Sequence, residues 1–164
     1  LEHAHWITDE QADLMAEHGT YYVPTFTVVN RGLELRQAQG IVGERGYLEK
    51  AIDVKYQSLE RVHKAGAKIA LGTDAGFVVC HGENARELEA FVEGGMTPME
   101  AIVAATSVGA DHLDMADLVG TVEAGKYADL VVVDGDPLED IRIVQDLDRI
   151  KIVMKDGKVV TQRA

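Results

Sequence analysis

A carboxylate follows a short apolar segment near the middle of the chain. Residues 67–71 read Ala-Lys-Ile-Ala-Leu, and Gly72, Thr73 and Asp74 come directly after them. The segment predicts a β-strand, which puts Asp74 at the carboxyl end of a strand, where α/β barrels and open α/β sheets keep their ligands. A carboxylate there can bind a metal ion or accept a proton from metal-bound water, and it can also cap the next helix.

Histidines supply the other groups with possible chemistry. His3 and His5 are separated by one residue, and on a strand this spacing puts both rings on the same side, which is one way to build a metal site. The alternative is that both rings are solvated. His81 follows Asp74 on the same predicted loop, either as a site residue or as an ordinary loop histidine. The sequence contains no phosphate-binding glycine loop and no Gly-X-Ser-X-Gly nucleophile motif.

Strands and helices alternate in the segments that would position these residues. Thr8 and Gln11 form a capping box that predicts the start of a helix, which ends at Gly19. The β-branched and aromatic residues from Tyr21 onward predict a strand with Thr25 at its carboxyl end. We expect residues 31–46 to be a loop with a short helical piece, and the apolar spacing predicts a helix over 47–64.

The second half changes character at about residue 120. Asn84 is the expected cap of a helix over 85–93, and Thr97 and Glu100 form a second capping box. A shorter helix is predicted over 108–113. After that, a buried strand is expected over 129–134, another over 150–154, and a hairpin turn at Asp156-Gly157. The change predicts two structural units, 1–115 and 116–164.

Composition limits the partners and the compartment. The 164 residues carry 16 basic and 28 acidic side chains, a formal charge of −12. Such a surface repels nucleic acid and anionic membranes, so we expect neither as a partner. No segment is apolar over the roughly 18 residues that a membrane span requires. A single cysteine and the absence of a signal-peptide pattern at the N-terminus favour a reducing, cytoplasmic location.

Several short motifs occur together in a fixed order. They are Leu1-Glu2-His3-Ala4, Tyr22-Val23-Pro24-Thr25, Gly72-Thr73-Asp74-Ala75, His81-Gly82, Gly95-Met96-Thr97-Pro98, and Gly125-Lys126-Tyr127-Ala128-Asp129-Leu130-Val131. This combination resembles the metal-dependent amidohydrolase superfamily, in particular its imidazolonepropionase-like and Xaa-Pro dipeptidase-like branch. The resemblance extends over essentially the whole chain.

The resemblance implies an α/β fold. It would be the C-terminal part of a (β/α)₈ TIM barrel, about strands 6 to 8, plus the C-terminal strands of a small β-sandwich. The family's sites hold one or two divalent metal ions, usually zinc. His3 matches the ligand on the sixth strand and Asp74 the ligand on the eighth, whereas His5 matches no family ligand. Strands one to five, with the other ligands, would precede Leu1.

The implied activity is hydrolysis of amide or peptide C–N bonds in a small-molecule substrate. Asp74 would be the catalytic proton shuttle, His81 would contact the substrate, and Tyr22 and Thr25 would line its pocket. Because a catalytic zinc normally takes three protein ligands, we expect this chain alone to be inactive. We expect it to form a homo-oligomer or to associate with the missing barrel half. The alternative is a non-catalytic structural or interaction module with the same fold.

Overall fold

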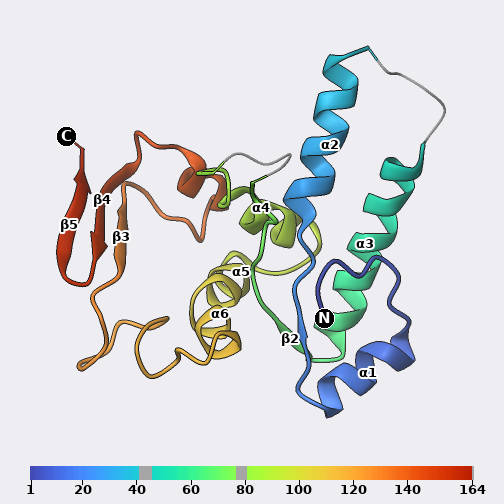
Figure 1. Ribbon diagram of the computed structural model, residues 1–164, viewed down its shortest axis with the longest axis horizontal. Coiled ribbons are helices and arrows are strands. Elements are labelled where there is room, and N and C mark those ends of the chain that lie inside the picture. The colour runs from blue at the N-terminus through green and yellow to red at the C-terminus, as the bar shows by residue number, and fades with distance from the viewer. Residues whose placement is uncertain (41–45, 77–80, 164) are drawn as a thin grey trace.

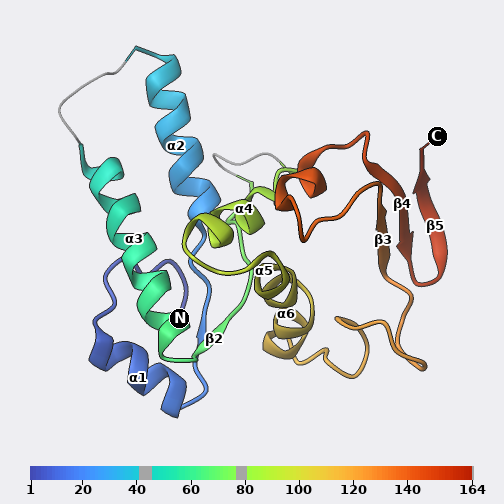
Figure 2. The ribbon, with the colours of Figure 1, turned by 180° about the vertical axis from the view of Figure 1, so that it is seen from behind.

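In the computed structural model, the residues described are 1–40, 46–76 and 81–163. The elements follow one another as α1 (Asp9–Glu17), β1 (Tyr21–Tyr22), α2 (Phe26–Ala38), α3 (Tyr47–Lys64), β2 (Lys68–Ile69), α4 (Arg86–Glu93), α5 (Pro98–Ala105), α6 (Ser107–His112), β3 (Leu130–Val133), the 3₁₀ helix η1 (Ile141–Gln145), β4 (Ile150–Lys155) and β5 (Lys158–Gln162). Figure 1 shows α2 and α3 side by side at one end and the β3–β5 sheet at the other, and the reverse view in Figure 2 agrees.

Three parallel segments run together through the first half. β1 pairs in parallel with β2, and Glu2 forms a parallel bridge with Val23 on the other side. The backbone N–H of His3 donates to the carbonyl of Val23 at 3.0 Å, and that of Ala70 donates to Tyr22 at 3.0 Å. The three segments therefore have their carboxyl ends at one edge, near His3, Thr25 and Asp74. The sequence predicts the strand ends at Thr25 and Asp74.

The core lies between these strands and the helices that flank them. Its fully buried members include Tyr22, Phe26, Leu59 and Phe91, and the Phe26 ring stacks on Tyr56 with centroids 4.6 Å apart. Ile141 of η1 joins the same cluster. Residues of the second half therefore contribute to the packing of the first, and the division at residue 115 stays a prediction.

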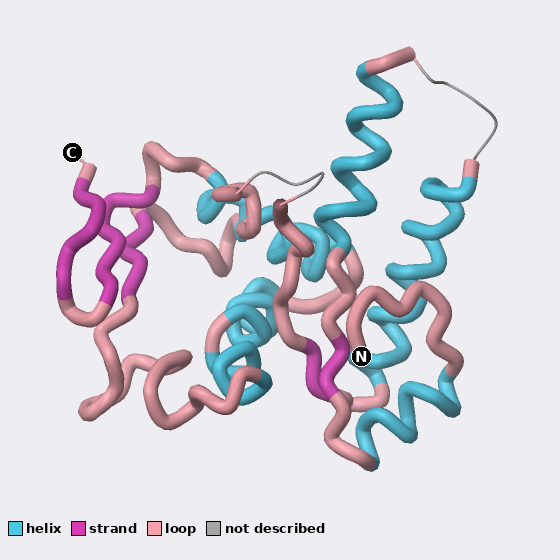
Figure 3. Tube along the Cα trace, in the orientation of Figure 1, coloured by secondary structure: helices cyan, strands magenta, loops and turns pink. Residues whose placement is uncertain are grey.

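The second half contains an antiparallel sheet in the order β3-β4-β5, drawn as the larger magenta group in Figure 3. The predicted hairpin turn is confirmed, with Asp156 and Gly157 both at positive φ. The strand expected over 129–134 is present as β3, but the expectation that it is buried is wrong, because Val131 and Val132 are 58% and 46% exposed. Their side chains have no second layer over them among the described residues.

Helix boundaries agree with the capping motifs in two cases out of three. Both capping boxes are confirmed, at Thr8 before α1 and at Thr97 before α5. Asn84 does not cap α4, whose N-cap is Ala85 without a side-chain cap. A loop with a short helical piece was expected over 31–46, but the helix is longer than that, since α2 continues to Ala38, and residues 41–45 lie outside the described residues. Among the described residues, no helix is long and apolar enough to cross a membrane.

Candidate metal centre

Each of the three parallel segments ends at a residue with a left-handed backbone. The φ angles are 62° at His3, 55° at Thr25 and 54° at Asp74. Left-handed backbone is uncommon outside glycine and is unfavourable for a β-branched residue such as threonine. Strained residues persist where the surrounding structure fixes them, and they gather at functional sites. These three neighbouring strand ends therefore form the candidate site.

A hydrogen bond joins the first two strand ends. His3 Nδ1 lies 2.9 Å from Thr25 Oγ1. The Thr25 hydroxyl also donates to the carbonyl of Pro24 at 2.6 Å. Thr25 is 3% exposed, whereas the His3 side chain is about half exposed and its Nε2 lies 3.8 Å from Glu2 Oε2. The imidazole is thus fixed at one nitrogen and open at the other.

Asp74 is exposed at the end of the third segment, and the glycine two residues before it, Gly72, is required by close packing. A Cβ on Gly72 would lie 2.6 Å from Val23 Cγ1. That distance is shorter than real Cβ contacts, so a side chain here would push the third segment away from the second. Gly72 therefore keeps the strand that carries Asp74 against the strand that carries Thr25.

Two buried ionisable side chains lie beneath this edge. Glu87 and Lys55 are both fully buried. Glu87 accepts from the backbone N–H groups of Phe26 and Thr27, each at 2.7 Å, and from Thr27 Oγ1 at 2.6 Å. Lys55 Nζ donates to the carbonyl of Thr25 at 3.1 Å. We call Lys55 and Glu87 the buried clamp, because both bind the turn over residues 25–27.

Burial and charge set the titration of the clamp. Burial lowers the pKa of Lys55 to about 8, against the opposing attraction of the Glu87 and Asp74 carboxylates. Burial also raises the pKa of Glu87, although its three hydrogen bonds favour the charged form. Burial likewise lowers the pKa of His5, assisted by the positive charge of Lys55.

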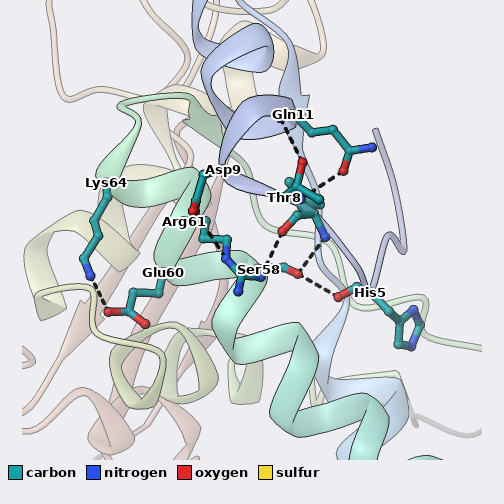
Figure 4. Close-up of polar contacts among 9 residues, drawn as sticks. His5, Thr8, Asp9, Gln11, Ser58, Glu60, Arg61 and Lys64 are labelled. Carbon is teal, nitrogen blue, oxygen red and sulfur yellow. Dashed lines mark hydrogen bonds and ion pairs between the residues drawn. The ribbon is translucent and has the colours of Figure 1, made fainter.

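The segment after His3 is anchored on α3, as Figure 4 shows. Ser58 Oγ donates to the carbonyl of His5 at 2.7 Å and accepts from the N–H of Ile7 at 3.0 Å. Arg61 donates to the carbonyl of Ile7 and lies 3.3 Å from Asp9. Helix α3 thus anchors the segment after His3 through Ser58 and Arg61, and it supplies Lys55 to the site from a position three residues before Ser58.

The remaining expected site residues are not joined to this group. Tyr22 is fully buried, and its hydroxyl donates to the carbonyl of Ala4 at 2.9 Å. His81 is exposed and follows residues 77–80, which lie outside the described residues. In the part of the chain that is described, no three His, Cys, Asp or Glu side chains converge as a metal cluster. The substrate roles of Tyr22, Thr25 and His81 stay predictions.

The buried clamp was missed from the sequence, although a signal exists. Lys55 is three residues after Ile52 and four before Leu59, so it occupies a core position on the apolar stripe of α3. Glu87 is likewise four residues before Phe91 on α4. A charged residue on the buried face of an amphipathic helix requires a partner. That rule would have singled out both residues.

Comparisons with known proteins identify the family of this chain. The sequence profile described as "Amidohydrolase family" matches residues 2–160. The chain belongs to the amidohydrolase family. An ochratoxinase of Aspergillus niger is 38% identical to this chain over 97% of its length. An imidazolonepropionase of Alkaliphilus oremlandii is 30% identical over 66% of it. These matches cover 33% and 26% of the two relatives, so the chain spans about a third or less of their length.

Solved structures are similar to the amidohydrolase chain in fold as well. The crystal structure of A. niger ochratoxinase has a TM-score of 0.83 and 36% identity, covering 99% of this chain and 37% of that one. A Xaa-Pro dipeptidase with bound methionine has a TM-score of 0.79 and 37% identity, covering 99% of this chain and 39% of that one. The imidazolonepropionase-like and Xaa-Pro dipeptidase-like branch predicted from the sequence is confirmed.

Proposed function

We propose that this chain forms part of the active site of a metal-dependent hydrolase that cleaves amide or peptide C–N bonds. The observation that carries the proposal is the common edge at which His3 and Asp74 end the two parallel segments that flank the segment of Thr25, each with a left-handed backbone. Membership of the amidohydrolase family and the similarity to an ochratoxinase and a Xaa-Pro dipeptidase support it.

The donors at this edge fit a divalent ion. An imidazole nitrogen with its partner nitrogen hydrogen-bonded and a carboxylate are ligands that zinc accepts. His3 and Asp74 would hold the metal together with ligands from outside these residues, and amidohydrolases generally use divalent metals. One or two zinc ions are our proposal for the complete site. A bound ion of this kind lowers the pKa of a water ligand and polarises a carbonyl group.

The residues of this chain then have distinct tasks. An Asp74 carboxylate oxygen accepts a proton from the attacking water and returns it to the leaving amine as a general acid. His3 holds its ring in place through Thr25. The three parallel segments ending at His3, Thr25 and Asp74 are proposed as strands 6, 7 and 8 of a (β/α)₈ barrel. The antiparallel sheet over β3–β5 is proposed as part of a β-sandwich.

The relatives support a substrate class for this proposal. We propose small amides with a free carboxylate, which include Xaa-Pro dipeptides and N-acyl amino acids, with cyclic amides as a further option. Tyr22, Thr25 and His81 remain the proposed contributors to the pocket. We also propose that other segments or a second copy of the chain complete the barrel. A cytoplasmic location is a further part of the proposal.

The test uses protein produced from the complete gene. Hydrolysis of a panel of Xaa-Pro dipeptides, N-acyl amino acids and cyclic amides is measured with zinc present. Asp74→Asn should reduce kcat by at least about 100-fold, since general acid–base catalysis contributes that much or more. Asp114→Asn is the matched control, because Asp114 is also exposed and has a φ of 56°. Normal turnover in Asp74→Asn would refute the proposal, and a wild-type protein inactive on the whole panel would favour the non-catalytic alternative.

A further inference from the structure

We propose that Thr25 is a positioning residue that fixes His3 as its Nδ1–H tautomer, and that the buried clamp of Lys55 and Glu87 holds Thr25 in the conformation this requires. The inference deepens the proposed function and rests on it in one respect: the nitrogen left free on His3 is the one offered to a divalent ion.

The Thr25 hydroxyl has a single proton and two neighbours. A carbonyl oxygen can only accept, so the 2.6 Å contact with Pro24 takes that proton. The contact of 2.9 Å with His3 Nδ1 must then have the nitrogen as donor and Oγ1 as acceptor. A neutral imidazole carries one N–H. The proton of His3 is therefore on Nδ1, and Nε2 has the lone pair.

The free nitrogen is accessible. Nε2 lies 3.8 Å from the nearest Glu2 carboxylate oxygen, which is too far for a hydrogen bond. The His3 side chain is about half exposed. Metal-binding histidines commonly donate their other ring N–H to a protein acceptor, which fixes both tautomer and orientation. The Thr25 hydroxyl is that acceptor for His3.

The Thr25 hydroxyl is available to His3 because another side chain caps the start of α2. Thr25 is the N-cap residue of this helix, but its side chain makes no cap hydrogen bond. Glu87 performs that task from α4, by accepting from the N–H groups of Phe26 and Thr27. A carboxylate at this point also interacts favourably with the helix dipole. Thr25 Oγ1 is thereby released for His3.

The same contacts explain how a buried threonine keeps a left-handed backbone. Its carbonyl accepts from Lys55 at 3.1 Å, while Glu87 fixes the next two N–H groups. The Lys55 ammonium is also 5.5 Å from the centre of the Phe26 ring. The turn is therefore bound on both its carbonyl and amide sides by groups that are fully buried.

The experiment compares Thr25→Val and Thr25→Ser in protein produced from the complete gene. Valine keeps the β-branched shape and lacks the hydroxyl, whereas serine keeps the hydroxyl. Long-range ¹H–¹⁵N correlation NMR reports which imidazole nitrogen carries the proton. It is recorded on metal-free protein at about pH 8.5, where an ordinary histidine with a pKa of about 6.5 is neutral. The His3→Gln variant assigns the His3 signal among those of the other histidines.

We expect the Nδ1–H tautomer in the wild type and in Thr25→Ser, and its loss in Thr25→Val. Zinc affinity should fall by about 10- to 100-fold in Thr25→Val and be recovered in Thr25→Ser. Glu87→Gln and Lys55→Met should each weaken the preference of His3 for the Nδ1–H tautomer. Whichever of the two variants folds is used to test the role of the buried clamp. An Nε2–H tautomer in the wild type, or an unchanged tautomer in Thr25→Val, would overturn the inference. Unchanged zinc affinity in His3→Gln would instead contradict the proposed function, and the tautomer result would still decide the role of Thr25.

Discussion

Replacing Glu87 by glutamine keeps the shape of the side chain, removes its charge and reduces its capacity to accept hydrogen bonds. One oxygen of Glu87 accepts from the N–H of Phe26, and the other accepts from the N–H and hydroxyl of Thr27. In Glu87→Gln one of these oxygens becomes an NH₂ group. If the amide oxygen remains with Thr27, the Phe26 N–H loses its acceptor in a fully buried site.

The magnitude is the sum of two effects. An orphaned buried donor costs about 1–3 kcal/mol. Lys55 also loses the carboxylate that favours its charge, but with a pKa of about 8 it can release its proton. Because this pKa is about one unit above pH 7, releasing the Lys55 proton costs about 1.4 kcal/mol, which is the upper limit of the second effect. Glu87→Gln should therefore lower the free energy of unfolding by about 2–4 kcal/mol.

The assay is urea unfolding at pH 7, followed by circular dichroism on protein produced from the complete gene. Glu89→Gln on the same helix is the matched control. Glu89 accepts a hydrogen bond from Gln145 at 2.8 Å in a partly exposed position. The control should change stability by less than about 0.5 kcal/mol. A loss below about 1 kcal/mol in Glu87→Gln, or equal losses in both variants, would refute the role given to the buried clamp.

Three further predictions concern separate contacts. The pKa of Lys55 is lowered from 10.5 to about 8, so between those pH values the unfolded chain binds the Lys55 proton and the folded chain does not. The free energy of unfolding should therefore rise with pH across this window. Urea titrations should show that Lys55→Met removes the rise. Gly72→Ala should destabilise by about 1–3 kcal/mol through its 2.6 Å contact with Val23, and thermal melts should show partial recovery when Val23→Ala is added. Thr97→Ala should lose about 1 kcal/mol with its capping box, whereas Val103→Ala on the exposed side of the same helix should lose less in the same melts.

Local signals in the sequence predicted the strand ends well. Asp74 and Thr25 were both expected after short strands, because glycine and proline end such segments clearly. The capping boxes at Thr8 and Thr97 depend on contacts within four residues, so they can be read without the tertiary structure. His3 was assigned by resemblance to the family, and its hydrogen bond to Thr25 joins residues 22 positions apart.

Tertiary contacts account for the errors. The start of α2 contains β-branched residues and a left-handed N-cap, which favour a strand or loop locally. Glu87, sixty residues away, supplies the missing cap. Asn84 is a good cap residue by type, but the helix begins two residues later at Arg86. Val131 and Val132 were expected to be buried because they are apolar. Apolar side chains in a strand do not show whether another layer packs on that strand.

The central claim is that His3 presents Nε2 to a divalent ion at the edge it shares with Asp74. The most direct measurement is a zinc anomalous difference map from crystals of protein produced from the complete gene and grown with zinc. We predict an ion about 2.0–2.1 Å from His3 Nε2, with an Asp74 carboxylate oxygen also at ligand distance. An ion bound through Nδ1 of His3, or no anomalous peak at this edge, would contradict the claim.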